Sequence, residues 1–364
     1  MENFRSMGGA SVILGGQWGS EGKGAAAAYV AHKLSQTGEF FDIATTNAGA
    51  QAGHTSVHEG ITRVVYHLPT VSLISNAITK RYTSLSYLNA GSIIDPEGLL
   101  KEIQEFDLFP KDLNGNHSLV IHPNAAIIEP HHRELEKRSN SSTAAIASTQ
   151  KGVGEALAEK VRRNAILANR LPNGHPLRPY VSSIDLNIRL QAGDDVVVEV
   201  PQGFSLSLNG PFYPYTTSRN CTLQQGLADA EIHPKFFHRS MLVLRTYPIR
   251  VGNLKVGGTL IGTSGPCYED QREMTWDEIG RPAEITTVTK RPRRIFTFSA
   301  HQTRAAMRAT QPNYVYLTFC DYLTPPQLDT TIDIIKKEAK DLGLNPYLIC
   351  QFGPTTYDVQ EYGK

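Results

Sequence analysis

Residues 11–28 read SVILGGQWGSEGKGAAAA, and this stretch decides the fold. The apolar run from Val12 to Leu14 is typical of a buried strand. A glycine-rich turn ending in Lys23-Gly24 follows it, and then a run of alanines that favours a helix. A strand, a glycine-rich turn and a helix in this order surround a phosphate with backbone N–H groups and a helix N-terminus. The stretch therefore predicts a phosphate-binding loop after the first strand of an α/β sheet.

The remaining pattern also favours an α/β fold. Apolar runs at residues 119–121, 196–198, 241–244 and 314–317 are typical of buried strands. Helical patterns lie at residues 25–34, 95–103 and 328–342. Strands that alternate with helices predict a mostly parallel central sheet. No linker divides the chain, and residues 252–294 have the composition of long irregular loops. We therefore expect residues 1–364 to form one large domain with long active-site loops.

The composition is that of a soluble globular protein. Of the 364 residues, 40% are hydrophobic and 20% are charged, and a net charge of +1 gives no reason to expect nucleic acid or a membrane as partner. The four cysteines form no C-x-x-C pair, which argues against a structural zinc site and a disulfide framework. The N-terminal residues lack the apolar core of a signal peptide, and no apolar run reaches the length of about 18 residues that a membrane helix needs. We expect a cytoplasmic protein.

The phosphate loop departs from the common P-loop pattern, G-x-x-x-x-G-K-[ST], at two positions. Gln17 stands where the first glycine is expected, and Gly24 replaces the Ser or Thr that holds magnesium. Lys23 keeps the positive charge that faces a transferring phosphoryl group. A tight turn that only packs a helix on a sheet is the structural alternative. The strand, the glycines and the lysine together favour phosphate binding over it.

Three further stretches carry polar groups suited to a ligand. Residues 47–55, NAGAQAGHT, are small, and His54 there suits a general acid or a phosphate hydrogen bond, although a single histidine is more often structural. Gln202 follows a buried strand, where the ligand sites of open α/β sheets gather, and a polar strand end is the alternative. Residues 286–294, TTVTKRPRR, suit the capture of carboxylate or phosphate by arginine, with a nucleic-acid patch and a solvated basic turn as alternatives.

Taken in order, these segments resemble the adenylosuccinate synthetase family. The family's Gln-Trp-Gly-Asp-Glu-Gly-Lys-Gly loop is similar to residues 17–24, with Ser20 in place of the aspartate. Its Asn-Ala-Gly-His-Thr is similar to residues 51–55, with Gln51 in place of the asparagine. Four more family motifs, Thr-Thr-Gly-Arg-Gly-Ile-Gly, Glu-Gly-Ala-Gln-Gly, Tyr-Pro-Tyr-Val-Thr-Ser and Thr-Gly-Arg-Pro-Arg-Arg, resemble residues 148–154, 199–203, 213–218 and 289–294. The resemblance covers nearly the whole chain.

The resemblance implies a ligase that joins aspartate to inosine monophosphate with GTP and Mg²⁺. The purine O6 attacks the γ-phosphate, and the aspartate amine then displaces phosphate from C6. By position, the implied catalytic residues are Ser20, Lys23, His54 and Gln202. The implied triphosphate site is Ser20, Glu21, Gly22, Lys23, Gly24, Gly53, His54, Thr55, Asp321, Gln351 and Gly353.

The other substrate sites follow from the same resemblance. The implied monophosphate site is Ser20, Gln51, Ser148, Thr149, Gln202, Leu206, Thr217, Arg291 and, from a second subunit, Arg163. The implied aspartate site is Thr287, Val288, Thr289, Arg291 and Arg293. Ser20 and the backbone carbonyl of Gly53 are the implied magnesium ligands. An arginine that acts in trans implies a homodimer.

Ser20 is the departure that bears on the substrate. The family's aspartate at this position removes the purine N1 proton, and a serine hydroxyl is no base without help from a neighbour. An acid beside N1 also lies near purine C2, where a serine leaves room and an acceptor for a 2-amino group. With Gln51 in the same pocket, the substitution resembles the phage branch of the family, which acts on dGMP and aspartate on the way to diaminopurine DNA.

We therefore expect dGMP as the substrate and, for a phage-encoded protein, the host cytoplasm as its location. The group that takes the N1 proton stays open, with water or the substrate's own groups as candidates. Two alternatives stay open as well: ordinary synthesis from inosine monophosphate and GTP with Ser20 tolerated, and a catalytically silent nucleotide-binding protein.

The donor site departs from the family too. Residues 318–321 read TFCD where the family has TKLD, so Phe319 replaces the lysine stem that covers guanine and can stack on any purine. Residues 351–354 read QFGP where the family has STGP. We hypothesise ATP or dATP as the donor, with Gln351 at the adenine edge. A switch GTPase fits poorly, because the hydroxyl after Lys23 and the guanine-reading lysine are both replaced.

Overall fold

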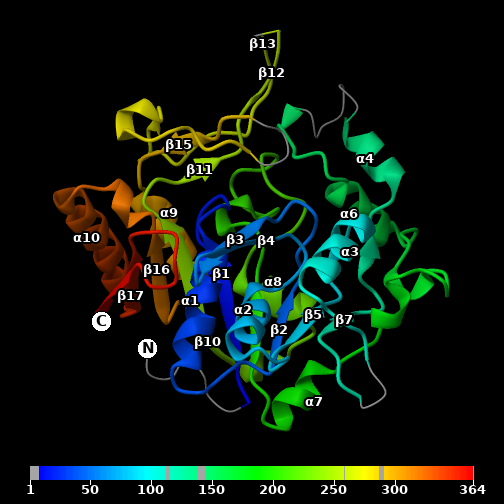
Figure 1. Ribbon diagram of the computed structural model, residues 1–364. Helices are drawn as coiled ribbons and strands as arrows, with labels where there is room; N and C mark the ends of the chain where they lie inside the picture. The colour runs from blue at the N-terminus through cyan, green and yellow to red at the C-terminus, as the bar shows by residue number, and fades with distance from the viewer. Residues whose placement is uncertain (1–7, 112–114, 138–144, 258, 287–290, 364) are drawn as a thin grey trace.

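A central sheet draws its strands from both ends of the chain (Figure 1). The computed structural model describes residues 8–111, 115–137, 145–257, 259–286 and 291–363, and within these ranges the sheet has nine strands. Across the sheet they are β18 (Val359–Gly363), β17 (Tyr347–Gln351), β16 (Tyr314–Thr318), β10 (Phe237–Arg245), β1 (Ala10–Gly15), β9 (Val196–Glu199), β2 (Ile43–Thr46), β5 (Leu85–Leu88) and β7 (Leu119–Ile121). All neighbours pair in parallel except β18, which is antiparallel to β17. The predicted α/β class is confirmed.

Helices cover both faces of the sheet, which explains why its strands read as apolar runs. Their bounds are α1 (Lys23–Ser35), α2 (Thr70–Thr79), α3 (Pro96–Glu105), α4 (Pro130–Lys137), α6 (Val153–Arg162), α7 (Leu186–Gln191), α8 (Leu223–Asp229), α9 (Ala300–Thr310) and α10 (Pro325–Asp341). Apolar residues of α1 and α2 pack with one face of β1, and those of α7 to α10 pack with the other. A parallel strand buried on both sides favours apolar residues at most positions. Figure 1 shows α10 on one flank of the molecule and α4 and α6 on the opposite flank.

The helix boundaries have local causes. Gly22, with φ 87°, is the residue before α1, and a left-handed backbone there is easiest for glycine. Pro96 begins α3, because a proline at the first helical position gives up only an N–H that has no partner in the helix. Thr324 and Gln327 form a capping box at the start of α10. These helices confirm the three predicted from the sequence.

Among the described residues, short strands form four smaller sheets beside the central one. They are β3 (His54–His58) with β4 (Ile61–Val65), β6 (Ile93–Ile94) with β8 (Ala126–Ile127), β12 (Leu254–Val256) with β13 (Thr259–Gly262), and β11 (Ile249–Arg250) with β15 (Arg294–Phe296) and β14 (Glu273–Met274). The region expected to be irregular thus contains a hairpin, β12–β13, which projects from the body in Figure 1. All four cysteines are free thiols. In the described ranges, every helix is too short or too polar to cross a membrane.

The packing of α8 on the sheet predicts the effect of one glycine substitution. A Cβ added to Gly226 would lie 2.6 Å from Cγ2 of Val200 and 3.4 Å from Cγ1 of Val198. Alanine favours a helix by about 1 kcal/mol over glycine, but overpacking against stiff valines costs about 1–3 kcal/mol. We expect Gly226→Ala to destabilise the protein by about 1 kcal/mol in urea unfolding. Gly174→Ala, where a Cβ meets nothing within 4 Å, is the control and should be near neutral. A stabilised Gly226→Ala variant would contradict this packing.

Candidate active site

A cavity of about 280 Å³ lies at the carboxyl ends of β1 and β9, where open α/β sheets place their ligand sites. The structure brings eleven of the predicted site residues to its wall: Ser20, Lys23, Gln51, Gly53, His54, Ser148, Thr149, Gln202, Leu206, Thr217 and Arg293. These residues come from segments far apart in the chain. The cavity is therefore one site built from the separate motifs seen in the sequence.

The phosphate loop is closed around the carboxylate of Glu21, which is fully buried. Oε1 of Glu21 accepts hydrogen bonds from the amides of Gln17 at 3.1 Å and Gly19 at 2.8 Å. Its Oε2 pairs with Nζ of Lys23 at 2.8 Å. The Glu21 side chain is thus part of the loop itself and is not available to a nucleotide. Gly24 lets α1 approach β3, because a Cβ there would lie 2.5 Å from the carbonyl oxygen of Thr55.

Ser20 and Gln202 reach the cavity from strained backbone positions. Both have left-handed φ values, 58° for Ser20 and 64° for Gln202. The Ser20 side chain is exposed, and its carbonyl accepts a hydrogen bond from Arg245 at 3.2 Å. The Gln202 carbonyl accepts one from Lys23, and its Oε1 accepts a weak bond from Cys221 Sγ at 3.5 Å. Left-handed non-glycine residues of this kind cluster at ligand sites.

His54 lies between the cavity and a buried carboxylate. Its Nδ1 is 4.0 Å from Oε2 of Glu199, and its Nε2 is buried with no hydrogen-bond partner among the described residues. Burial, with the positive charge of Lys23 adding to it, lowers the pKa of His54 to about 3. Burial also raises the pKa of Glu199 to about 7, against the hydrogen bonds from the amides of Thr70 and Val71. His54 is therefore neutral near pH 7 in the ligand-free protein.

One wall of the cavity is formed by the segment between α4 and α6. Glu136 of α4 accepts hydrogen bonds from the amides of Gly152 at 2.8 Å and Gly154 at 3.1 Å, which fixes the turn before α6. Arg291 does not line the cavity, but its guanidinium donates to the carbonyls of Ala147 at 3.2 Å and Ser148 at 3.4 Å. The turn and Arg291 together shape the wall that carries Ser148.

Arg163 lies away from the cavity. It follows the last residue of α6, and its side chain is exposed. The structure therefore does not bring Arg163 to the site of its own chain.

The predicted aspartate residues Thr287, Val288 and Thr289 lie outside the described residues. Arg293 lines the cavity, and its carbonyl accepts a hydrogen bond from Nε1 of Trp276 at 2.8 Å. Sequence reasoning missed Arg250, which also lines the cavity and donates to the carbonyls of Pro266 and Tyr215, both at 2.8 Å. Burial, with the nearby charge of Arg294, lowers the pKa of Arg250 to about 9, so it is still a cation at pH 7. Arg250 ends the two-residue strand β11, which no apolar run in the sequence marks.

The predicted donor-base residues Asp321, Gln351 and Gly353 lie outside the cavity. Gln351 ends β17, and Asp321 follows β16 and pairs with Arg281 at 3.3 Å. Thr318, at the end of β16, connects this region to the phosphate loop, because its hydroxyl donates to the carbonyl of Glu21 at 2.7 Å. The donor-base region is thus a neighbour of the phosphate loop.

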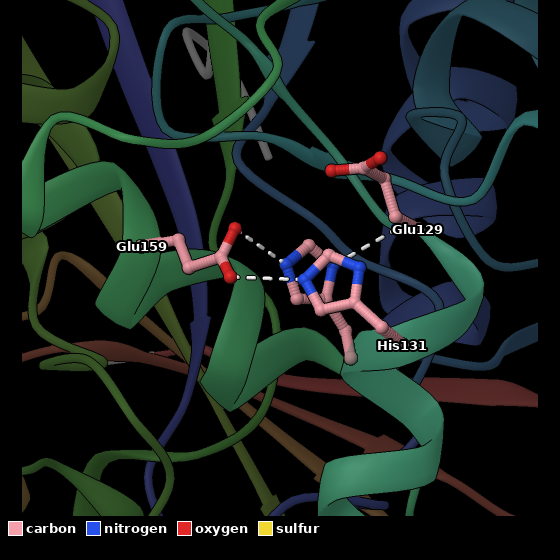
Figure 2. Close-up of side chains that lie close together, drawn as sticks. Glu129, His131 and Glu159 are labelled. Atoms are coloured by element: carbon pink, nitrogen blue, oxygen red, sulfur yellow. Dashed lines mark hydrogen bonds and ion pairs between the residues drawn. The ribbon is translucent and has the colours of Figure 1, made fainter.

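A second polar cluster lies between α4 and α6, away from the cavity (Figure 2). The donor atoms of Glu129, His131, His132 and Glu159 lie within 4.8 Å of one another, and Nε2 of each histidine is 2.9 Å from a Glu159 oxygen. The amide of Glu129 donates to Nδ1 of His132 at 2.9 Å, so neutral His132 carries its proton on Nε2. A metal at Nε2 would need the lone pair there. The geometry therefore favours a polar cross-link between the two helices over a metal centre.

Glu199 predicts a pH dependence of stability. Its pKa is about 7 in the fold and near 4.5 in the unfolded chain, so the folded state holds the extra proton between these values. Stability therefore falls as pH rises from about 4.5 to 7, by on the order of 2–3 kcal/mol. Glu199→Gln lacks this titration, so its stability relative to wild type should improve between about pH 5 and pH 8 in urea unfolding. Parallel stability curves for the two proteins would show that Glu199 is not buried as a protonated acid.

Comparisons with known proteins identify the family of the chain. The family model described as adenylosuccinate synthetase matches residues 12–181 and 173–334. The N6-succino-2-amino-2'-deoxyadenylate synthase of Salmonella phage PMBT28 is 34% identical, over 96% of this chain and 96% of the relative. The adenylosuccinate synthetase of Pyrococcus sp. strain ST700 is 32% identical, over 91% of this chain and 89% of the relative. A structure of the cyanophage S-2L succinoaminodeoxyadenylate synthetase, bound to dGMP and to dATP as an energy donor, has a TM-score of 0.82 at 32% identity, over 97% of this chain and 95% of that chain. The chain belongs to the adenylosuccinate synthetase family.

Proposed function

We propose that this protein is a carbon–nitrogen ligase that condenses dGMP with L-aspartate at the expense of ATP or dATP. The product is 2-amino-2'-deoxyadenylosuccinate, a precursor of diaminopurine DNA. The observation that carries the proposal is Ser20, an exposed serine on the cavity wall where the family's loop has an aspartate. The phage relative at 34% identity and the cyanophage structure with dGMP and dATP support it.

The chemistry follows from the groups around the cavity. The dGMP O6 attacks the γ-phosphate, which gives a 6-phosphoryl purine and a nucleoside diphosphate. The aspartate amine then attacks C6 and displaces phosphate. Lys23 and the buried Nε2 of His54 stabilise the transferring phosphoryl group, and the Gln202 amide orients O6. Because His54 is neutral before the nucleotides bind, it acts through one N–H hydrogen bond rather than as a fixed cation.

Ser20 and Gln51 select the base. Both line the cavity, and Ser20 presents a hydroxyl that accepts a hydrogen bond from the 2-amino group of guanine. A site built to bind an amino group disfavours the analogue that lacks it, because its acceptor is then left unpaired. This preference separates dGMP from inosine monophosphate.

Mg²⁺ suits the oxygen donors at the mouth of the loop. The Ser20 hydroxyl and the Gly53 carbonyl are hard donors, which match Mg²⁺, and both residues are exposed at the cavity. Neither donor is charged, so these residues would hold Mg²⁺ together with the phosphates of the nucleotide. When bound, the ion supplies positive charge to the transferring phosphoryl group.

The remaining substrate groups are assigned by position. Thr149, Leu206 and Thr217 hold the monophosphate together with Arg163 of a partner subunit, since the exposed Arg163 side chain lies away from its own cavity. Arg293, on the cavity wall, binds an aspartate carboxylate, which arginine can do in bidentate fashion. Arg291 joins it only if its guanidinium leaves the carbonyls of Ala147 and Ser148. The enzyme in this scheme is a homodimer with shared sites.

The first test is phosphate release with dGMP, aspartate, Mg²⁺ and ATP, beside the same mixture with inosine monophosphate. We expect turnover with dGMP and at least about tenfold less with inosine monophosphate, because the 2-amino contact is lost. Ser20→Asp should reverse the preference toward inosine monophosphate. Turnover of the wild type with inosine monophosphate alone would restore the ordinary synthetase, and strong preference for GTP over ATP would contradict the donor assignment. No phosphate release with either monophosphate, although the nucleotides still bind, would favour a catalytically silent nucleotide-binding protein.

Arg163 is tested by mixing two inactive variants. In Arg163→Met and His54→Asn homodimers every site lacks one group. A hybrid dimer has one intact site if Arg163 acts in trans, so random mixing should recover about a quarter of the wild-type activity. Mixing each variant with itself is the control. Failure to recover activity in a mixture shown to contain hybrids would place Arg163 outside the partner's site.

A further inference from the structure

Arg245 has no place in the chemistry above, although it is the largest fully buried side chain among the described residues. It is the last residue of β10, and the side-chain amide of Gln17 binds both its backbone N–H and its carbonyl. The Gln17 side chain donates to the Arg245 carbonyl and accepts from the Arg245 amide, both at 3.0 Å. The position of Arg245 is therefore fixed to the start of the phosphate loop.

The Arg245 guanidinium contacts three different parts of the site. Its Nη1 donates to the Ser20 carbonyl at 3.2 Å. Its Nη1 and Nη2 both point to the Glu284 carboxylate, at 3.4 and 2.6 Å. Its flat face lies over the Phe319 ring, 3.9 Å from the ring centre. A guanidinium makes this combination possible because it has donors in its plane and a polarisable face above it.

Two of these contacts, with Phe319 and with Glu284, connect Arg245 to the binding regions of two different substrates. Phe319 takes the place of the family's base-covering lysine and so belongs to the donor-base region. Glu284 stands at the base of the segment that carries the predicted aspartate residues, since its carbonyl accepts from the Arg293 amide at 2.8 Å. The neighbouring Thr286 amide donates to the Arg291 carbonyl at 2.8 Å, which closes the base of that segment. Arg245 is thus shared by the two regions.

We infer that Arg245 is a positioning residue that couples the binding site of the donor base to the binding site of aspartate. This inference rests on the proposed function and on the donor-base residues that the family resemblance implies. A donor base that presses on Phe319 moves the guanidinium plane, and the plane carries Glu284 and the base of the aspartate segment with it. Arg245 touches neither substrate and acts through Phe319 and Glu284. The third contact of Arg245, with the Ser20 carbonyl, leads to the part of the proposed dGMP site that recognises the base.

The test compares Arg245→Lys and Arg245→Met with wild type. Lysine keeps the charge but loses the paired bonds to Glu284 and the flat face over Phe319. We expect Arg245→Lys to raise the KM for ATP and for aspartate by about tenfold each. The KM for dGMP should rise as well, because the Ser20 carbonyl loses its contact with Nη1. Arg245→Met should raise the KM for ATP and for aspartate further. Thermal melts of each variant confirm folding, and the lysine variant answers the question if the methionine variant does not fold.

Two further variants separate coupling from general damage. Glu284→Gln should raise the KM for ATP although Glu284 is far from the donor base in sequence, and its effect should be non-additive with Arg245→Lys. Arg304→Met, which removes a paired arginine between α9 and α10, is the matched control and should change none of the constants. Glu284 is bound to Arg245 and not to Ser20, so the KM for dGMP should stay within about twofold in Glu284→Gln. Equal rises in all three KM values in Glu284→Gln, or effects additive with Arg245→Lys, would overturn the inference.

The ATP affinity of each variant is also measured by calorimetry, which needs no turnover. A wild type that binds ATP but does not turn over dGMP would refute the proposed function and leave the calorimetric test intact. An unchanged ATP affinity in Arg245→Lys would refute the coupling alone.

Discussion

The site depends on one buried carboxylate, that of Glu21. Two loop amides and Lys23 bind its oxygens, and no water-exposed surface remains on it. Two glycines make room for it, because a Cβ on Gly15 or Gly203 would lie 2.4 or 2.2 Å from its oxygens. A buried carboxylate is tolerated only with such partners, and removing one leaves an uncompensated charge. The end of β1, the start of α1 and the turn after β9 are therefore held together as one unit, and Ser20 and Gln202 take their places from it.

The sheet was predictable where its strands are purely apolar and not where they bury polar groups. Runs such as Val196–Val198 identified β9, because a strand covered on both faces favours apolar residues at most positions. In contrast, β2 reads IATT and β5 reads LSYL, although every residue of both is buried. Their hydroxyls are satisfied by distant partners. Thr46 donates to the carbonyl of Glu199 at 2.7 Å, and the hydroxyls of Ser86 and Ser72 lie 2.7 Å apart. Local hydrophobicity does not reveal hydrogen-bond partners that are distant in the sequence.

The residues of the site also differ in whether the local sequence reveals them. Lys23 and Gln202 were found because each stands in a short motif after a predicted strand, and parallel strands bring these ends to one edge. His54 was found because it stands in a stretch of small residues that allows close approach of a ligand. Arg245 has no such motif. It follows an apolar run like any strand end, and its burial is allowed by Gln17, 228 residues away, and by Glu284, 39 residues away. A charged residue can be buried only with its partners, so its position is a property of the assembled sheet edge and not of the sequence around it.

The proposed substrate preference depends on Ser20, and the backbone conformation of Ser20 bears on why a serine stands there. With φ 58° it lies in the left-handed region, where aspartate and asparagine are favoured over other side chains. The backbone alone would thus keep the family's aspartate, so the reason for serine must lie in what its side chain meets. The neighbouring carboxylate of Glu21 cannot replace the lost base, since its oxygens are bound by Gln17, Gly19 and Lys23. In the proposed function, the loop therefore offers the purine edge a hydroxyl and no free carboxylate, and water and the substrates' own phosphate oxygens are the candidates for taking the N1 proton.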